Sequence, residues 1–275
     1  MRSFGGAQLR SRTIPFVIAR EIGSGRPLVA LHGFGVDHRI MLPLAEWIGD
    51  APWRLVLLDL PWAESAARGA AVSSTREVAR SVLAEIDDHL GDEPFAVIGN
   101  SYGAMLARHV AHERRPRVRG LATLAGVFRP AHHERNVPER TVVHAESSVL
   151  DAAGDAREAF EEISVIQDAA SFAAFQRYVL PGLRGADAAV MDRIAADYAL
   201  DGVPEDRHPE PFTAPTLHVF GRQDDVVGYE DGLALRGHYP RGSFVVLDGA
   251  GHNVHLEQPD VTGALFREWL ARMDR

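Results

Sequence analysis

The chain of 275 residues contains no cysteine and no lysine, so all 29 of its basic residues are arginine. Without cysteine there is no disulfide, no thiolate nucleophile and no cysteine-bound zinc. Without lysine, Schiff-base chemistry, the lysine of a phosphate-binding loop and a serine–lysine dyad are excluded. An arginine-rich, lysine-free composition is typical of GC-rich bacterial genomes.

Positive charge is also scarce, because 38 acidic residues outweigh the basic ones and give a net charge of −9. Nucleic acids and anionic membranes attract proteins through a positive field, so we expect neither as a partner. No apolar run approaches a membrane span, and the N-terminal residues lack the apolar segment of a signal peptide. We therefore expect a cytoplasmic monomer or homodimer that acts on a small molecule.

The order of predicted elements indicates an α/β fold. Strand-like runs alternate with helical patterns, which predicts a mostly parallel sheet with helices on both faces. The clearest helices cover residues 74–90, with Ser74 and Glu77 as a candidate capping box, and residues 259–273. The predicted strands are residues 16–19, 27–31, 54–60, 95–99, 118–124, 216–220 and 243–247.

The alternation stops after residue 128 and resumes at residue 213. The residues between, 129–212, are rich in alanine, glutamate, arginine and leucine, which favour helices. This change of pattern predicts one core domain, made of residues 1–128 and 213–275, and a helical insertion at residues 129–212.

The most informative motif is Gly99-Asn100-Ser101-Tyr102-Gly103, which lies between an apolar strand and a helical segment. A serine at such a turn has an exposed hydroxyl close to the positive end of a helix. A Cβ at either glycine would crowd the neighbouring strand or helix. Small residues also occur at strand–helix turns for packing alone, so the rest of the chain must decide between the two interpretations.

Two further loops at predicted strand ends carry the groups that a serine nucleophile needs. A serine hydroxyl needs a general base, and that base needs a carboxylate to orient it. Asp224 follows one strand and His252 follows the next, in the order Ser, Asp, His. Other side chains of these loops compete for the same roles, namely Asp225, Asp248 and His255.

On these residues the chain resembles the α/β-hydrolase superfamily, from about residue 16 to the last helix. The resemblance implies a catalytic triad of Ser101, Asp224 and His252, since the family's Gly-x-x-Asp pattern selects Asp224 over Asp225. It also implies an oxyanion hole formed by the backbone N–H groups of Tyr102 and of Phe34, which follows His32-Gly33. The chemistry of such a site requires no metal or other cofactor.

The helical insertion resembles the lid that many α/β-hydrolases place over the substrate cleft. We expect a substrate pocket lined by Phe34 and by apolar side chains of the lid. The lid candidates are Phe172, Phe175, Tyr178, Met191 and Tyr198. The alternative is that these side chains only pack the lid helices together.

A serine at the turn predicts hydrolysis of an ester, thioester or lactone through an acyl-serine. Gly99-Asn100-Ser101 also resembles the turn of the meta-cleavage product hydrolases, which cut carbon–carbon bonds in dienoates. Those enzymes usually have tryptophan after the catalytic histidine, where this chain has Asn253. Carbon–carbon hydrolysis is therefore one alternative, and a ligand receptor without turnover is a second.

Overall fold

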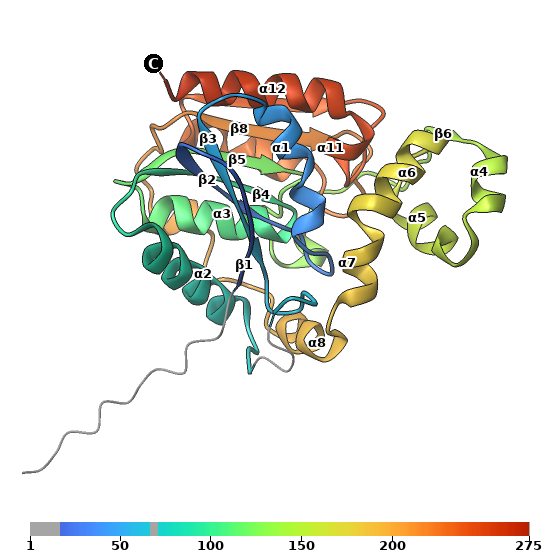
Figure 1. Cartoon of the computed structure of the whole chain (residues 1–275), viewed down its shortest axis with the longest axis horizontal. Coiled ribbons are helices and arrows are strands. Elements are labelled where there is room, and N and C mark those ends of the chain that lie inside the picture. The colour runs from blue at the N-terminus through green and yellow to red at the C-terminus, as the bar shows by residue number, and fades with distance from the viewer. Residues whose placement is uncertain (1–16, 67–70, 275) are drawn as a thin grey trace, which may run out of the picture.

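The computed structural model describes residues 17–66 and 71–274, and contains a central sheet of seven strands flanked by helices (Figure 1). The seven predicted strands are all present, although Phe16 lies outside the described residues. The strands are β1 (Val17–Gly23), β2 (Arg26–Leu31), β3 (Trp53–Asp59), β4 (Phe95–Asn100), β5 (Val118–Leu124), β8 (Thr216–Gly221) and β9 (Gly242–Leu247).

The sheet has the order β1-β3-β2-β4-β5-β8-β9. The edge strand β1 is antiparallel to β3, and the other pairs are parallel. From β2 the chain passes to β3 on one side and then to β4 on the other, so the strand order reverses there. A reversal of this kind opens a crevice at the carboxyl ends of the strands, where α/β proteins bind ligands.

Helices cover both faces of this sheet (Figure 1). On one face α3 packs against β2, β4 and β5, and α2 packs against α3. On the other, α12 packs against α1 and β8. The helices of the core are α1 (Pro43–Ile48), α2 (Thr75–Leu90), α3 (Tyr102–Glu113), α10 (Glu230–Ala234), α11 (Val254–Glu257) and α12 (Pro259–Arg272).

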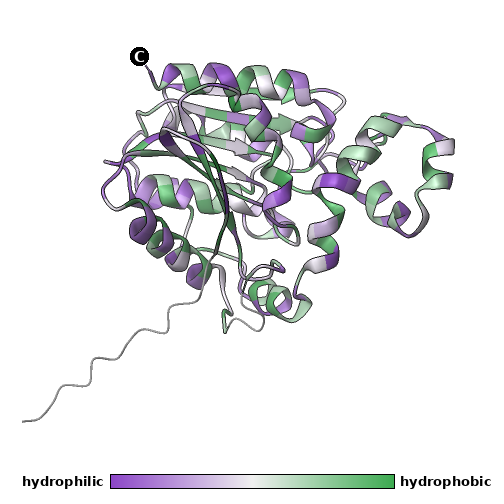
Figure 2. Cartoon of the chain, in the orientation of Figure 1, coloured by the Kyte–Doolittle hydropathy of each residue, from purple (hydrophilic) through white to green (hydrophobic). Residues whose placement is uncertain are grey.

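Helix α2 shows how the sequence pattern produces this packing. Val78, Val82 and Ile86 are buried on one face, and Figure 2 shows hydrophilic colour on the opposite side of the helix. The Ser74 side chain accepts a hydrogen bond from the N–H of Glu77, as the capping box predicts. The Glu77 carboxylate, however, accepts from the N–H of Ser73, one residue earlier than in a capping box.

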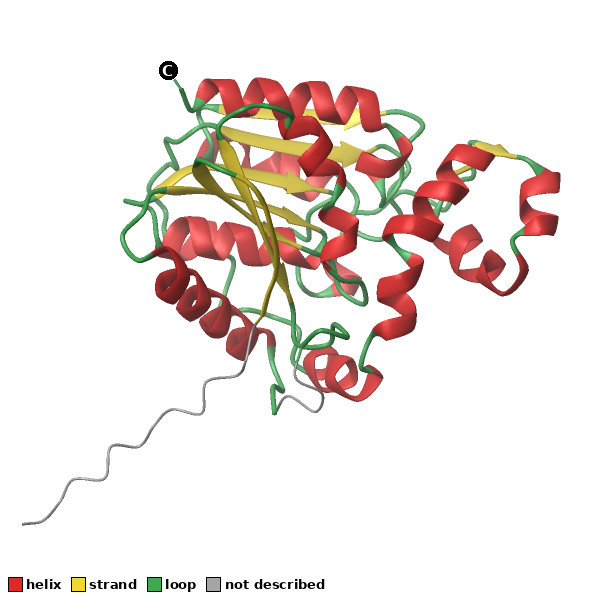
Figure 3. Ribbon diagram, in the orientation of Figure 1, coloured by secondary structure: helices red, strands yellow, loops and turns green. Residues whose placement is uncertain are grey.

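The segment between β5 and β8 corresponds to the predicted helical insertion, and Figure 3 shows its short helices separated by loops. Its first part projects from the core as a separate lobe (Figure 1). In the described part of the chain no helix is both long and apolar enough to cross a bilayer. The lid elements are β6 (His144–Ala145), α4 (Ser147–Ala152), α5 (Arg157–Ile163), β7 (Ile166–Gln167), α6 (Ala169–Tyr178), α7 (Leu180–Gly185), α8 (Ala188–Ala196) and α9 (Pro204–Arg207).

A buried ion pair fixes the last lid helix to the core. Arg108 of α3 donates through Nε to Glu205 Oε1 of α9 at 2.7 Å, and both side chains are about as buried as any in the protein. The Tyr239 hydroxyl donates to the same carboxylate, and Arg108 Nη1 donates to the carbonyl of Val127 at 2.8 Å. Burial alone would raise the pKa of Glu205, but Arg108 overrides it and lowers that pKa to about 2.

Three buried histidines predict a loss of stability in mild acid. Burial lowers the pKa of His112 to about 4, of His218 to about 3 and of His255 to about 4. Their ordinary value is 6.5, so the unfolded chain binds protons more strongly than the folded chain below that pH. We expect the free energy of unfolding to be highest above pH 6.5 and to fall toward pH 4, with each histidine approaching about 1.4 kcal/mol per pH unit.

Urea denaturation at several pH values measures this loss. His255→Gln should flatten the dependence on pH, whereas the same change at the exposed His133 should leave it as it is. Equal slopes for wild type and His255→Gln would show that His255 does not titrate as its burial requires.

Candidate active site

Ser101 lies at the turn between β4 and α3, at the crevice where the strand order reverses. Its backbone has φ +52° and ψ −116°, a conformation that is strained for a residue with a side chain. The flanking glycines permit this turn: a Cβ on Gly99 would lie 2.2 Å from the carbonyl oxygen of Gly103, and one on Gly103 would lie 2.2 Å from that of Leu31. The close contacts on both sides of Ser101 thus require glycine at positions 99 and 103.

Gly103→Ala tests this close approach. The new Cβ would meet the carbonyl oxygens of both Leu31 and His32, so the end of β2 would have to move away from the turn. We expect the free energy of unfolding to fall by about 3 kcal/mol, measured by urea denaturation. Gly237→Ala is the matched control, since a Cβ there meets nothing within 4 Å. Equal stability of the two variants would show that the contact at Gly103 is not needed.

The structure brings Ser101, His252 and Asp224 together from three loops. His252 Nε2 lies 2.9 Å from Ser101 Oγ, and its Nδ1 lies 3.1 Å from Asp224 Oδ2. The Asp224 carboxylate is fully buried and also accepts the N–H groups of Val226 and Val227 at 3.0 Å. These donors hold the carboxylate so that it accepts from His252 Nδ1–H, which leaves Nε2 free to accept the serine proton.

The competing residues of these loops lie elsewhere. Asp225 faces Arg140 at 3.7 Å, and Asp248 accepts from Gln223 Nε2 at 2.8 Å. His255 Nε2 donates to the carbonyl of Ile40 at 2.9 Å. None of the three forms a hydrogen bond with Ser101 or His252.

Two loops present backbone N–H groups beside Ser101. Tyr102 is the first residue of α3, so its N–H has no partner within the helix. The loop of Gly33 and Phe34 also touches this turn, because a Cβ on Gly33 would lie 3.3 Å from Ser101 Cβ. Both predicted oxyanion donors thus lie on loops that meet at the serine.

His32 fixes the second of these loops, a role that the sequence did not reveal. Its Nε2 accepts the N–H of Leu60 at 2.9 Å and its Nδ1–H donates to the carbonyl of Gly33 at 2.8 Å. Burial lowers the pKa of His32, which favours the neutral ring that this donor and acceptor arrangement requires.

Glu257 is a second positioning group that no sequence motif marked. Its Oε1 accepts the N–H of Val165 at 2.7 Å in the lid, and its Oε2 accepts the N–H of Gly251 at 2.7 Å, directly before His252. Burial raises the pKa of Glu257, and the backbone donors partly oppose this shift. The carboxylate therefore connects the lid to the loop that carries His252.

A cavity of about 430 Å³ opens beside Ser101 and His252. Helices α5 and α7 of the lid form one wall, and the loop after β2 forms another. The apolar lining consists of Phe34, Val36, Ile40, Ala159, Ile163, Val179 and Leu183. A cleft of this size and character suits the body of a small organic substrate.

Of the predicted pocket residues, only Phe34 lines this cavity within the described part of the chain. The other five predicted residues do not line this cavity, because they pack against other side chains of the lid and the core. Phe172 and Phe175 pack on Phe160 at centroid distances of 5.0 and 5.3 Å. Tyr198 and Met191 lie in contacts between lid and core.

Tyr198 packs on Phe34 at 5.6 Å and on Tyr102 at 5.2 Å, so it supports the cavity wall from behind. Met191 approaches Gly35, where its Cε would lie 3.2 Å from an added Cβ. Tyr178 is buried, with the Arg177 guanidinium 4.9 Å above its ring. The alternative interpretation, packing within the lid, thus fits Phe172 and Phe175, whereas Tyr198 and Met191 contact the core.

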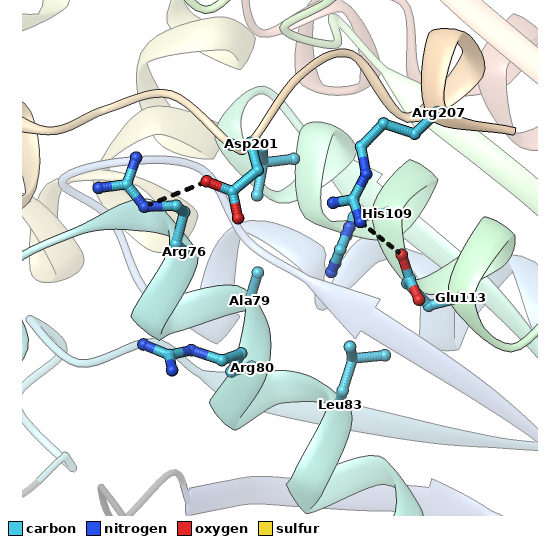
Figure 4. A pocket seen from close by; sticks show the side chains of 9 residues that line it. Arg76, Ala79, Arg80, Leu83, His109, Glu113, Asp201 and Arg207 are labelled. Carbon is cyan, nitrogen blue, oxygen red and sulfur yellow. Dashed lines mark ion pairs between the residues drawn. The ribbon is translucent and has the colours of Figure 1, made fainter.

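A second cavity of about 420 Å³ lies between α2, α3 and α9, and none of the three site residues lines it (Figure 4). Two of its arginines face carboxylates: Arg76 Nε lies 3.4 Å from Asp201, and Arg207 lies 3.9 Å from Glu113. Among the described residues, no three histidine or acidic side chains are grouped as ligands for a metal. The site around Ser101 therefore remains the candidate for chemistry.

The sequence profile of the Alpha/beta hydrolase family matches residues 28–265, which include all three side chains of the site. This chain belongs to that family. The predicted fold, a mostly parallel sheet with helices on both faces and an inserted helical lid, is confirmed for this hydrolase.

Relatives of the hydrolase carry names for different reactions. It is 24% identical over 251 residues to a pimeloyl-[acyl-carrier protein] methyl ester esterase of Legionella pneumophila strain Paris, covering 90% of this chain and 96% of that protein. It is 25% identical over 255 residues to a putative non-heme haloperoxidase of Mycobacterium phage D29, covering 89% and 87%. A solved alpha/beta superfamily hydrolase from Oenococcus oeni PSU-1 superposes with a TM-score of 0.87 at 24% identity, covering 94% of this chain and 96% of that one.

Proposed function

We propose that this protein is a serine hydrolase that cleaves an ester, thioester or lactone of a small molecule through an acyl-serine. The observation that carries the proposal is the continuous chain of contacts from Ser101 Oγ to His252 Nε2 at 2.9 Å and from His252 Nδ1 to the buried Asp224 at 3.1 Å. The esterase name of one relative supports the same reaction class.

In the first half-reaction Ser101 Oγ attacks the carbonyl carbon while its proton passes to His252 Nε2. The carbonyl oxygen becomes an anion, for which the N–H groups of Tyr102 and Phe34 are the proposed donors. The imidazolium, held by Asp224, then gives the proton to the leaving oxygen or sulfur as the tetrahedral intermediate collapses. An acyl-serine and a free alcohol or thiol result.

In the second half-reaction water attacks the acyl-serine, and His252 takes the water's proton. Collapse of the second intermediate returns that proton to Ser101 Oγ and releases the carboxylic acid. The balance is one water consumed and one acyl bond cleaved. In this proposal residues 1–128 and 213–275 provide the catalytic core, and residues 129–212 form the lid over the cavity.

Carbon–carbon hydrolysis of a dienoate is a second candidate, supported by Gly99-Asn100-Ser101. It requires the same serine and histidine but a substrate whose leaving group is a carbanion. Asn253, which lines the cavity beside His252, stands where the enzymes of that class usually have tryptophan. This difference in the cavity favours the ester substrate.

The proposal is tested by turnover of p-nitrophenyl acetate and butyrate together with labelling by a fluorophosphonate. We expect hydrolysis of at least one ester, and an adduct that mass spectrometry maps to the peptide containing Ser101. A dienoate ring-fission product in the same assay separates the second candidate. Binding of esters without turnover would instead indicate a receptor, and labelling at another residue would overturn the assignment of Ser101.

A further inference from the structure

The cavity beside Ser101 has one carboxylate in its lining and no arginine among the described residues that line it. That carboxylate is Glu162, on lid helix α5. Ala159 and Ile163 of the same helix also line the cavity, so this stretch of α5 forms part of the wall. A substrate that enters the cavity therefore passes a negative charge and meets no guanidinium to balance it.

Charged groups lie near Glu162, but none of those described forms an ion pair with it. The Arg140 guanidinium donates to the carbonyls of Glu161 and Ser164 and faces Asp225 at 3.7 Å. The preceding residue, Glu161, pairs with Arg157 at 3.2 Å. Glu162 itself forms no ion pair with any residue in the described ranges 17–66 and 71–274. Its side chain is exposed, and it lines a cavity whose other lining residues are mainly apolar.

We infer that Glu162 sets the charge preference of this hydrolase, so that it prefers cationic esters, such as those with a quaternary or primary ammonium group, over neutral esters, and neutral over anionic ones. The inference rests on the proposed function. Apolar walls strengthen the attraction between a carboxylate and a nearby cation relative to bulk water. The net charge of −9 acts in the same direction over longer distances.

The negative charge of Glu162 also disfavours carbon–carbon hydrolysis of a dienoate, the second candidate reaction. Dienoate ring-fission products are carboxylates, and a buried or half-buried carboxylate needs a cation or several hydrogen-bond donors for binding. The lining of this cavity offers Ser101, Asn100 and Asn253 as its uncharged polar side chains, in addition to His252. A substrate without negative charge fits this lining better.

The test uses two matched series of thioesters. In the first, butyrate forms a thioester with each of three thiols. Thiocholine is cationic, its isostere with tert-butyl in place of trimethylammonium is neutral, and mercaptopropionate is anionic. In the second, the same three end groups are placed on the acyl chain. A chromogenic disulfide reagent reports the released thiol, and the protein gives no background because it has no cysteine.

We expect wild type to show a higher kcat/KM for the cationic than for the isosteric neutral thioester in at least one series. Glu162→Gln should lower this ratio about tenfold, and Glu162→Lys should invert it. Glu158→Gln is the matched control, because it removes the same charge from an exposed position of α5 that does not line the cavity. Its ratio should stay within about twofold of wild type, and added salt should lower the wild-type ratio.

A ratio that is equal in wild type and Glu162→Gln, or that Glu158→Gln changes as strongly, would overturn the inference. If Ser101 hydrolyses the neutral thioesters but Glu162→Gln leaves the ratio of kcat/KM values unchanged, only this inference fails. If no thioester is hydrolysed and the fluorophosphonate does not label Ser101, the proposed function fails and the inference fails with it.

Discussion

Replacing Ser101 with alanine is expected to lower kcat for ester hydrolysis by about 10⁴-fold or more, since the variant lacks the oxygen that forms the acyl intermediate. Only Oγ is removed, together with its hydrogen bond to His252 Nε2 at 2.9 Å. The backbone turn, with its N–H bond to the carbonyl of Leu124, stays in place. Steady-state kinetics on the ester that the wild type hydrolyses fastest measures the loss.

A double variant separates catalysis from folding. Groups that act as one unit give non-additive losses, so Ser101→Ala combined with His252→Ala should be about as slow as Ser101→Ala alone. Urea denaturation should give Ser101→Ala a stability close to that of wild type. Ester turnover at the wild-type rate in Ser101→Ala would refute the role of this serine.

Breaking the buried ion pair is expected to have the largest effect on stability. Glu205→Gln leaves the Arg108 guanidinium buried without its counter-charge, which costs about 3–5 kcal/mol of the free energy of unfolding. Arg108 also donates to the carbonyl of Val127, whose own N–H donates to the carbonyl of Ser101. Loss of the pair should therefore loosen the serine turn as well as helix α9.

Urea denaturation of a double-mutant cycle measures the interaction. The cycle consists of Arg108→Met, Glu205→Leu and their double variant. The double variant removes both charges, so it should be much more stable than the sum of the two single losses predicts. Arg184→Gln is the surface control, because the ion pair of Arg184 with Asp155 is exposed and should change stability little. Additive losses in the cycle would show that the two side chains do not stabilise each other.

The sequence predicted the parts of the site that local rules determine. Each strand end is followed by a short loop, and Ser101, Asp224 and His252 each lie in such a loop, so parallel pairing brings them to one edge. The glycines of the serine turn were predicted from sterics, and the structure shows the carbonyl oxygens that exclude a Cβ. Every step of that prediction involves residues close together in the chain.

The lining of the cavity could not be predicted in the same way. The lid consists of short helices with apolar side chains on more than one side. The hydrophobic periodicity of the sequence alone does not tell which side faces the substrate and which packs inward. Phe172 and Phe175 turned toward Phe160, while Ala159 and Glu162 line the cavity. The role of Glu257 depends on an N–H group 92 residues away, which no local pattern reveals.

The position of Glu257 has a consequence for any motion of the lid. Its carboxylate accepts hydrogen bonds from backbone N–H groups of two separate segments, at a position that is largely buried from water. Pulling residue 165 outward would leave one of those oxygens without its donor, so the detached form is disfavoured beyond the loss of apolar contact. Two hydrogen bonds to one carboxylate thus resist separation of residue 165 from the loop that carries His252.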